Sequence, residues 1–238
     1  MKNKSQFKEF ARYSTLNVLG MIGLSCYILA DTFFVSRGLG ENGLTALNLA
    51  IPVYSFIHGS GLMLGIGGAT KYSIFKSNKE NKNANTIFTN TLCLATVLSI
   101  GFVLIGIFLS KSLTTALGAD SDVFKMTNTY LQFILIFAPA FIMNDVLICF
   151  VRNDNSPKLS MYAMLGGSLS NIILDYIFIF PLQLGIFGAV FATGLAPIIS
   201  MLILSLHRIK RKNQFHFIKI KPSIKIARNT LSLGFPSL

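Results

Sequence analysis

The sequence predicts an all-α integral membrane protein, built as a lobe of six transmembrane helices. The first observation behind this prediction is composition: 52% of the 238 residues are hydrophobic, only 13% are charged, and the mean hydropathy is +0.60. Soluble domains of this size are rarely so apolar. The second is that apolar runs of about 20 residues, the length that crosses a bilayer, recur along the chain. We expect spanning helices at residues 13–35, 46–70, 86–110, 126–150, 160–180 and 186–206.

The basic residues predict how these helices are oriented. With the N-terminus in the cytoplasm, nearly all of the 21 Lys and Arg residues fall on the cytoplasmic side, and Arg37, Lys111 and Lys125 are the exceptions. This distribution follows the positive-inside rule. We therefore expect a multi-pass protein of the plasma membrane with a cytoplasmic N-terminus and the lipid bilayer as its partner. The net charge of +12 is then an orientation signal, and nucleic acid is not an expected partner.

The sequence has none of the patterns that are typical of enzymes. Cys26, Cys93 and Cys149 are scattered without C-x-x-C spacing, and there is neither a phosphate-binding glycine loop nor a zinc-binding spacing. We therefore expect no enzymatic activity and no enzymatic cofactor. His58 stands alone in the second apolar run, where a histidine is expected to make a packing hydrogen bond.

The first four expected spans carry several local signals. The stretch SRGLGENGLTA predicts a glycine-rich outer turn between the first two. Gly61-x-x-x-Gly65 predicts a face on which another helix packs closely. The third span carries no charge and is interpreted as scaffold. Asp122 is expected to cap the fourth span, and Pro139 to kink it. Asp145 is interpreted as an interfacial carboxylate near the cytoplasmic end.

Four polar residues in the apolar spans form the candidate functional site: Asp31, Asn171, Asp175 and Thr193. Asn171 and Asp175 share a helix face because they are four residues apart. At a rise of about 1.5 Å per residue, Asp31 lies roughly 27 Å and Asp175 roughly 22 Å from the inner ends of their spans. Thr193 reaches the same layer from the outer side, and Pro197 lacks the N–H that would bond the Thr193 carbonyl.

This polar layer has two interpretations. A buried polar pair can hold two membrane helices together. Alternatively, acids in a membrane interior can bind a cation or exchange a proton. Two carboxylates at one depth repel each other when both are ionised, which favours a bound proton or cation between them. The set of oxygen donors therefore favours a site for Na⁺ or H⁺.

The same residues carry a resemblance to a known family. The segments ADTFFVSRGLGENGLTALNLAIPV and FVRNDNSPKLSMYAMLGGSLSNIILDYIFIFPLQLGIFGAVFAT resemble the N-terminal half of MATE (multidrug and toxic compound extrusion) transporters, and are similar above all to the bacterial multidrug-efflux members. The resemblance implies that Asp31 and Asp175 are ion-binding carboxylates, with Asn171 and Thr193 as neutral ligands. Many members have a proline in the first half of the first helix, whereas residues 16–30 contain none. A proline-bend mechanism is therefore not implied.

The resemblance also implies a function and a division of the chain. A MATE transporter has about twelve helices in two lobes, so we expect a fragment whose missing partner is a C-terminal lobe. The implied activity is antiport coupled to Na⁺ or H⁺. It exports organic compounds, which we expect to be cations. One alternative is a flippase for a lipid-linked precursor, which deep acids disfavour, and another is an inert truncated product. The expected divisions are a six-helix lobe at 1–206, a basic cytoplasmic linker at 207–225 and the start of a seventh helix at 226–238.

Overall fold

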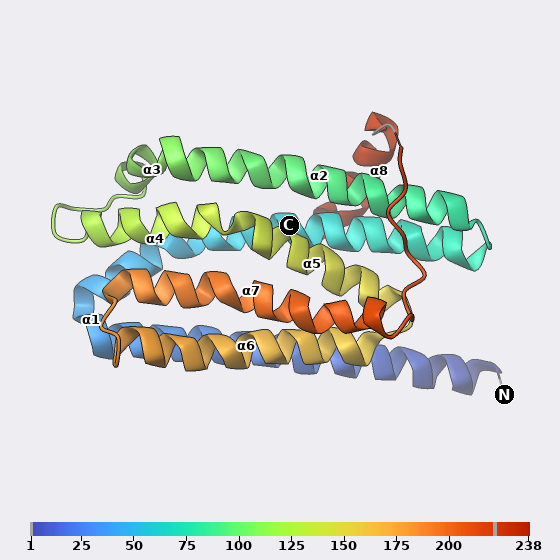
Figure 1. The fold of residues 1–238 in the computed structure, drawn as a ribbon, viewed down its shortest axis with the longest axis horizontal. Helices are drawn as coiled ribbons and strands as arrows, with labels where there is room; N and C mark the ends of the chain where they lie inside the picture. The colour runs from blue at the N-terminus through green and yellow to red at the C-terminus, as the bar shows by residue number, and fades with distance from the viewer. Residues whose placement is uncertain (1, 221–222) are drawn as a thin grey trace.

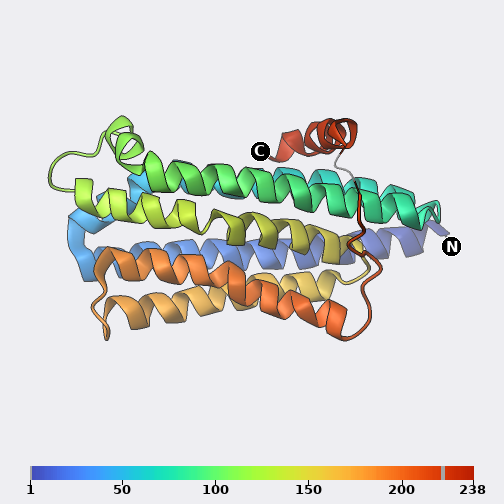
Figure 2. The same cartoon turned by 45° about the horizontal axis from the view of Figure 1, so that its top comes forward.

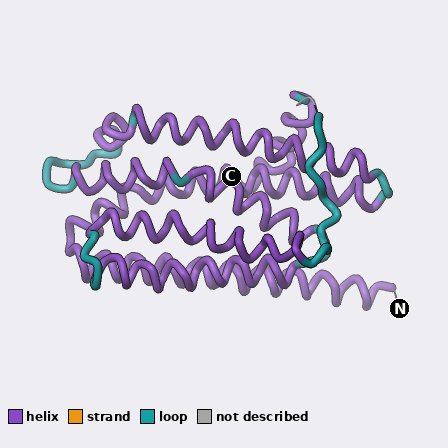
Figure 3. The backbone as a smooth tube through the Cα atoms, in the orientation of Figure 1, coloured by secondary structure: helices purple, strands orange, loops and turns teal. Residues whose placement is uncertain are grey.

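Long helices lying side by side make up the fold of the computed structural model, which describes residues 2–220 and 223–238, with side chains described from residue 11 onward. Figure 1 shows that most of the helices run along the longest axis of the molecule, and Figure 3 shows that loops are confined mainly to the two ends of the bundle. In chain order the elements are α1 (Lys2–Ser77), α2 (Asn81–Phe108), α3 (Ser110–Ala116), α4 (Phe124–Ile136), α5 (Ala138–Asn153), α6 (Pro157–Ile179), α7 (Gly185–Ile209), α8 (Ile224–Gly234) and the short 3₁₀ helix η1 (Phe235–Ser237).

The helix α1 is folded back on itself at a single residue. Gly40 has φ 69° and ψ −158°, a combination that is essentially confined to glycine. Figure 1 shows the first part of α1 running from the N-terminus to the opposite end of the bundle, where the chain reverses and returns. The predicted outer turn at SRGLGENGLTA is therefore too long, because helical structure continues on both sides of Gly40.

A bend separates α4 from α5, and its position fits the proline in the sequence. The two helices meet at Phe137 with an angle of 47°, and Pro139 lies in the first turn of α5. Proline has no N–H to donate to the preceding turn, and its ring clashes with that turn. The predicted kink at Pro139 is confirmed.

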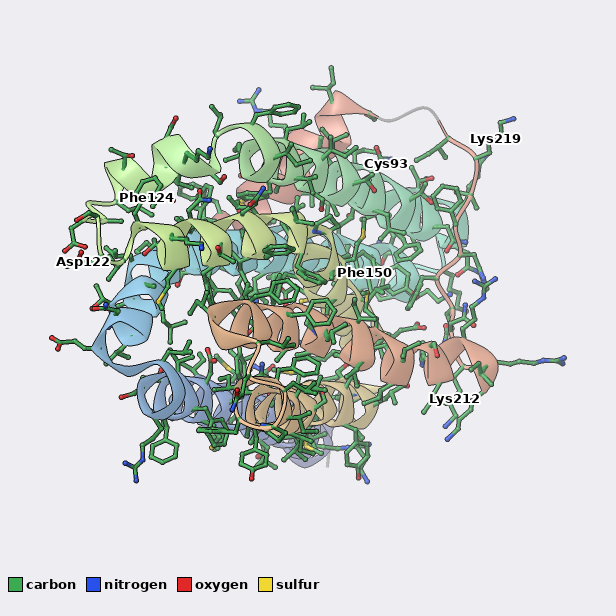
Figure 4. All side chains as sticks on the ribbon, turned by 60° about the vertical axis from the view of Figure 1, so that its left-hand side comes forward. Cys93, Asp122, Phe124, Phe150, Lys212 and Lys219 are labelled. Carbon is green, nitrogen blue, oxygen red and sulfur yellow. The ribbon has the colours of Figure 1, made fainter. Side chains whose placement is uncertain are left out.

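The start of α4 differs from the prediction. Asp122 makes no capping hydrogen bond to this helix. Instead, the Asp120 carboxylate accepts the backbone N–H groups of Asp122 and Val123, at 3.1 and 3.2 Å. Figure 4 shows Asp122 at the outer end of the loop, away from the helices. The predicted cap at Asp122 is therefore wrong, and Asp120 organises this loop instead.

The structure embeds in a membrane through helices that are apolar along their length. Within the described part of the chain, four helices are long and apolar enough to cross a bilayer, and the bent pair α4–α5 makes a fifth if it is one span. The four are Ala11–Ser77, Asn81–Phe108, Pro157–Ile179 and Gly185–Ile209. The first two expected spans both fall within α1, on either side of Gly40.

Glycine allows α1 and α5 to pack closely. A Cβ atom added to Gly61 would lie 2.7 Å from the Asp145 Oδ2 atom, and one added to Gly65 would lie 2.9 Å from Cys149 Sγ. Real Cβ atoms essentially never approach other atoms within 3.0 Å. The predicted close packing at Gly61-x-x-x-Gly65 is confirmed, and α5 is the helix that packs there.

One end of the bundle is held together by a buried aspartate and an aromatic cluster. The Tyr72 hydroxyl donates to Asp154 Oδ1 at 2.8 Å, and His207 Nε2 lies 2.8 Å from Asp154 Oδ2. Rings from α1, α2 and α5 meet beside these groups, and Figure 4 shows Phe150 among the packed helices. The Gln214 N–H also donates to Asp154 Oδ2, at 2.7 Å. Asp154 thereby joins α1, α7 and the segment that follows α7.

That segment turns at residues 210–211 and then crosses the bundle without regular secondary structure at residues 212–220 (Figures 1 and 2). Three side chains of α2 bind the backbone that leads to α8. Asn85 Oδ1 accepts the His216 N–H at 2.9 Å, and Thr89 Oγ1 accepts the Ile218 N–H at 3.1 Å. Asn90 Oδ1 accepts the N–H of Ser223, just before α8, at 2.9 Å. The path of the chain is therefore fixed by polar groups on α2.

Candidate cation-binding site

Small residues bring α6 and α7 together at the candidate site. A Cβ atom added to Gly167 of α6 would lie 3.1 Å from the Ala196 carbonyl oxygen, and one on Gly188 of α7 would lie 3.0 Å from Phe178 Cβ. The chain turns between the two helices at residues 180–184. Asp175 lies near the end of α6 and Thr193 near the start of α7, so both side chains occupy the same half of the bundle.

Asn171 links Asp175 to Thr193 in the interface between α6 and α7. With the amide oriented to satisfy both neighbours, its nitrogen donates to Asp175 Oδ2 at 3.0 Å and its oxygen accepts the Thr193 N–H at 3.3 Å. The Thr193 hydroxyl donates to the Ala189 carbonyl oxygen at 3.0 Å. Asn171 and Asp175 are fully buried and Thr193 is 3% exposed. The three residues predicted from these helices therefore form one connected, water-excluded group.

Asp31 reaches this group from α1. It is 6% exposed and lines a cavity of about 100 Å³ together with Tyr27, Tyr54, Tyr130 and Thr193. Thr193 therefore belongs both to the Asn171–Asp175 group and to the wall of the Asp31 cavity. The sequence did not single out Tyr130 or Tyr54, whose positions depend on how the helices pack. Tyr27 shares a helix face with Asp31, and its hydroxyl is hydrogen-bonded to that of Tyr54.

Two carboxylate oxygens of the site are left without a partner. Among the described residues, neither Asp31 Oδ1 nor Asp175 Oδ1 has a hydrogen-bond partner, although both are buried. Buried polar atoms are paired in the great majority of cases, so an unpaired one needs an explanation. A bound proton or a monovalent cation would satisfy these atoms, and carboxylate, amide and hydroxyl oxygens are donors suited to hard cations.

The carbonyl of Thr193 loses its usual intrahelical donor. The helix α7 continues through Pro197 from Gly185 to Ile209. Because Pro197 has no N–H, it cannot donate the usual intrahelical hydrogen bond to the Thr193 carbonyl.

A second, larger cavity adjoins the same residues. It has a volume of about 200 Å³, and its lining includes Tyr54, His58, Phe141, Asp145, Arg152 and Thr193. The Arg152 guanidinium is hydrogen-bonded to the Asn17 side chain of α1. Asp145 is only 3% exposed and lies against His58. Helix packing therefore buries Asp145 in the cavity wall, and its position near the cytoplasmic interface stays a prediction.

The fold is that of a membrane transporter. A MATE transporter solved in complex with MaD3S superposes with a TM-score of 0.88 at 28% identity, over 95% of this chain and 52% of that one. A transporter of the MOP superfamily from Pyrococcus furiosus, described as having a binding pocket of reverse polarity that suggests a different function, superposes with a TM-score of 0.86. It is also 28% identical, over 95% of this chain and 51% of that one.

The sequence comparisons define the family within this class. The family model described as MatE matches residues 18–177, and the chain belongs to this family. The multidrug export protein MepA of Staphylococcus saprophyticus is 24% identical over 99% of this chain and 53% of its own length. MepA of Staphylococcus aureus strain MRSA252 is 24% identical over 97% and 52%. The chain thus spans about half the length of the curated relatives it matches. Members of this family are transporters rather than enzymes.

Proposed function

We propose that this chain forms one lobe of a cation-coupled antiporter that exports organic cations across the plasma membrane. In this proposal the lobe has six spans, two of which are the parts of α1 on either side of Gly40, and its N-terminus is cytoplasmic. A second lobe completes the transporter, because alternating access requires two bodies that move against each other around a central site. The boundaries of the lobe, linker and following helix remain those expected from the sequence.

Asp31, Asn171, Asp175 and Thr193 are the proposed coupling site for Na⁺ or H⁺. The observation that carries this proposal is the pair of buried carboxylates, Asp31 and Asp175, each with one oxygen that lacks a partner among the described residues. Thr193 connects them, because it lines the Asp31 cavity and is linked to Asp175 through Asn171. Burying an ionisable group in a membrane is costly, so such groups usually serve transport or proton transfer. If these residues only joined helices, the Asn171 amide alone would suffice, and no unpaired carboxylate oxygen would be needed.

The choice of an organic cation as substrate rests on charge. The acids Asp31 and Asp145 line the two cavities. Arg152 is the observation that favours the alternative, a lipid-linked anionic precursor, because it lines one end of the larger cavity. Its side chain is bonded to Asn17, and Asp145 lines the same cavity, so this cavity also offers a counter-charge for a cation.

Thermal unfolding of the purified chain in lipid nanodiscs tests the coupling site. If Na⁺ binds, the unfolding temperature should be higher in sodium chloride than in potassium chloride at the same concentration. The reason is that a ligand that binds only the folded state stabilises it. If H⁺ is the coupling ion, substrate binding should instead release protons into a weakly buffered solution. Either response should disappear in Asp31→Asn and Asp175→Asn. Asp122→Asn is the matched control, because Asp122 is exposed in the outer loop.

Transport is measured separately, as ethidium efflux from liposomes with sodium and pH gradients imposed one at a time. A transporter in which this lobe is joined to a second lobe should export ethidium, and Asp175→Asn should abolish the export. The chain by itself should not export. If neither cation affects the wild-type chain, the four residues return to a structural role.

A further inference from the structure

Asp145, a buried acid outside the proposed coupling site, is paired with a histidine across two helices. Asp145 belongs to α5 and His58 to the second part of α1. The His58 Nδ1 atom lies 2.8 Å from Asp145 Oδ2, and the two side chains are 23% and 4% exposed respectively. Neither residue contributes to the proposed coupling site. Ionisable groups inside a membrane are costly and usually face a functional cavity.

The Asp145 carboxylate lies between α1 and the cavity. Gly61 faces it so closely that any Cβ atom there would lie 2.7 Å from Asp145 Oδ2. The same oxygen lies 2.8 Å from His58 Nδ1, and Asp145 also lines the cavity of about 200 Å³. A cation in this cavity can therefore reach the carboxylate only in competition with the imidazole.

Aromatic side chains line the same cavity. The Tyr54 ring is stacked on the His58 ring, with centroids 6.1 Å apart and an interplanar angle of 6°. Phe141 packs edge-on against Tyr54, with centroids 5.5 Å apart. Tyr27 lines the cavity as well. Aromatic rings attract cations through their negative faces, and quaternary ammonium groups are commonly recognised by several rings together.

We propose that the His58–Asp145 pair is a binding site for the ammonium head group of an organic cation. Asp145 supplies the counter-charge, and the aromatic rings surround the head group. When His58 is protonated, it is an internal cation that occupies the carboxylate in the absence of ligand. The ligand then competes with His58 for Asp145. This inference rests on the proposed export of organic cations but assigns the substrate charge to residues that are separate from the coupling site.

The size and charge of the cavity limit what can bind. About 200 Å³ is below the roughly 300–1,000 Å³ that is typical of pockets for drug-sized ligands. The cavity therefore accepts a head group, and the rest of a larger molecule extends outside it. The titratable or charged groups that line it are Tyr27, Tyr54, His58, Asp145, Cys149 and Arg152. Arg152 is bonded to Asn17, and Asp145 is the acid among the described residues that line this cavity.

Binding of choline to the full chain in nanodiscs tests this inference by ligand-observed NMR. The neutral carbon isostere of choline, 3,3-dimethylbutan-1-ol, is the comparison ligand, because it has the same shape without the charge. We expect choline to bind at least tenfold more tightly than the isostere. Asp145→Asn should remove this preference and leave isostere binding unchanged. His58→Gln should tighten choline binding several-fold, because it removes the internal competitor and keeps a polar side chain.

The double variant His58→Gln with Asp145→Asn protects the test against misfolding. It replaces the ion pair by two neutral amides that can still bond across α1 and α5, so it should fold and show no preference for choline. Asp122→Asn, in the exposed outer loop, should keep the preference, which shows that its loss is specific to Asp145. If wild-type chain binds choline and the isostere equally, or if Asp145→Asn retains the preference, the inference is overturned. An absent sodium or proton response combined with an Asp145-dependent preference would refute the coupling site and support this inference.

Discussion

The substitution Gly194→Ala tests how tightly α7 is packed next to Thr193. A Cβ atom on Gly194 would lie 2.4 Å from both Cγ and Cδ2 of Phe137 and 2.7 Å from its Cε2. Ordinary contacts of a Cβ atom begin at 3.4 Å, so the Phe137 ring would have to move away by about 1 Å. Overpacking of this degree lowers the stability of native cores. Phe137 cannot retreat freely, because it forms the bend between α4 and α5 and also packs against Phe191.

The expected magnitude follows from two opposing effects. Overpacking of this kind costs about 1–3 kcal/mol, and alanine is favoured over glycine in a helix by roughly 0.5–1 kcal/mol. The net loss is therefore at most about 2.5 kcal/mol. At roughly 2–4 °C per kcal/mol for a chain of this size, the unfolding temperature should fall by up to about 10 °C.

Thermal unfolding in nanodiscs measures this loss, with Gly101→Ala as the matched control. Gly101 is also in a helix, but an added Cβ atom there meets nothing within 4 Å, so this substitution should be neutral or stabilising. In a Phe137→Ala background, Gly194→Ala should no longer destabilise the chain, because the clashing ring is gone. The packing argument is refuted if Gly194→Ala is as stable as Gly101→Ala, or if its cost persists without the Phe137 ring.

Two further predictions concern the polar contacts at the other end of the bundle. Tyr72→Phe removes the 2.8 Å hydrogen bond to buried Asp154, and chemical unfolding should show a loss of about 1.5–3 kcal/mol. The control is Tyr162→Phe, on a residue that is 56% exposed, which should change stability by less than about 0.5 kcal/mol. Equal effects of the two substitutions would contradict the role of the bond. Thr89→Val removes the acceptor of the Ile218 N–H, so amide hydrogen exchange at Ile218 should accelerate, and unchanged protection would show that another group holds this segment.

Much of the fold follows from properties that the sequence carries locally. Apolar runs predict helices because backbone polar groups must be satisfied internally in lipid. Pro139 predicts the break between α4 and α5, because proline cannot complete the helical hydrogen bonds. The outer turn was predicted to be longer than it is, because glycine and polar residues are typical of loops. At this turn one glycine, Gly40, suffices to reverse the chain.

The candidate site was only partly predictable. Asn171 and Asp175 share a face by spacing alone, and the estimates of depth align them with Asp31 and Thr193. The pairing of His58 with Asp145 depends on how α1 and α5 are rotated about their axes, which spacing within either helix does not determine. Two ionisable groups of opposite charge in apolar spans were the available signal, since such groups tend to pair with each other. The Asp154 contacts were missed because a carboxylate next to a turn predicts exposure.

The helix α2 binds the segment after α7 through backbone groups of that segment. This affects which substitutions the segment can tolerate. The donors at residues 216, 218 and 223 are backbone N–H groups, which every amino acid except proline possesses. The acceptors are side chains of α2. Selection should therefore act on Asn85, Thr89 and Asn90, while the segment itself can change its side chains and keep its path. The exposed Lys219, which projects away from the helices in Figure 4, is accordingly a position where a reporter group can be attached without displacing the chain.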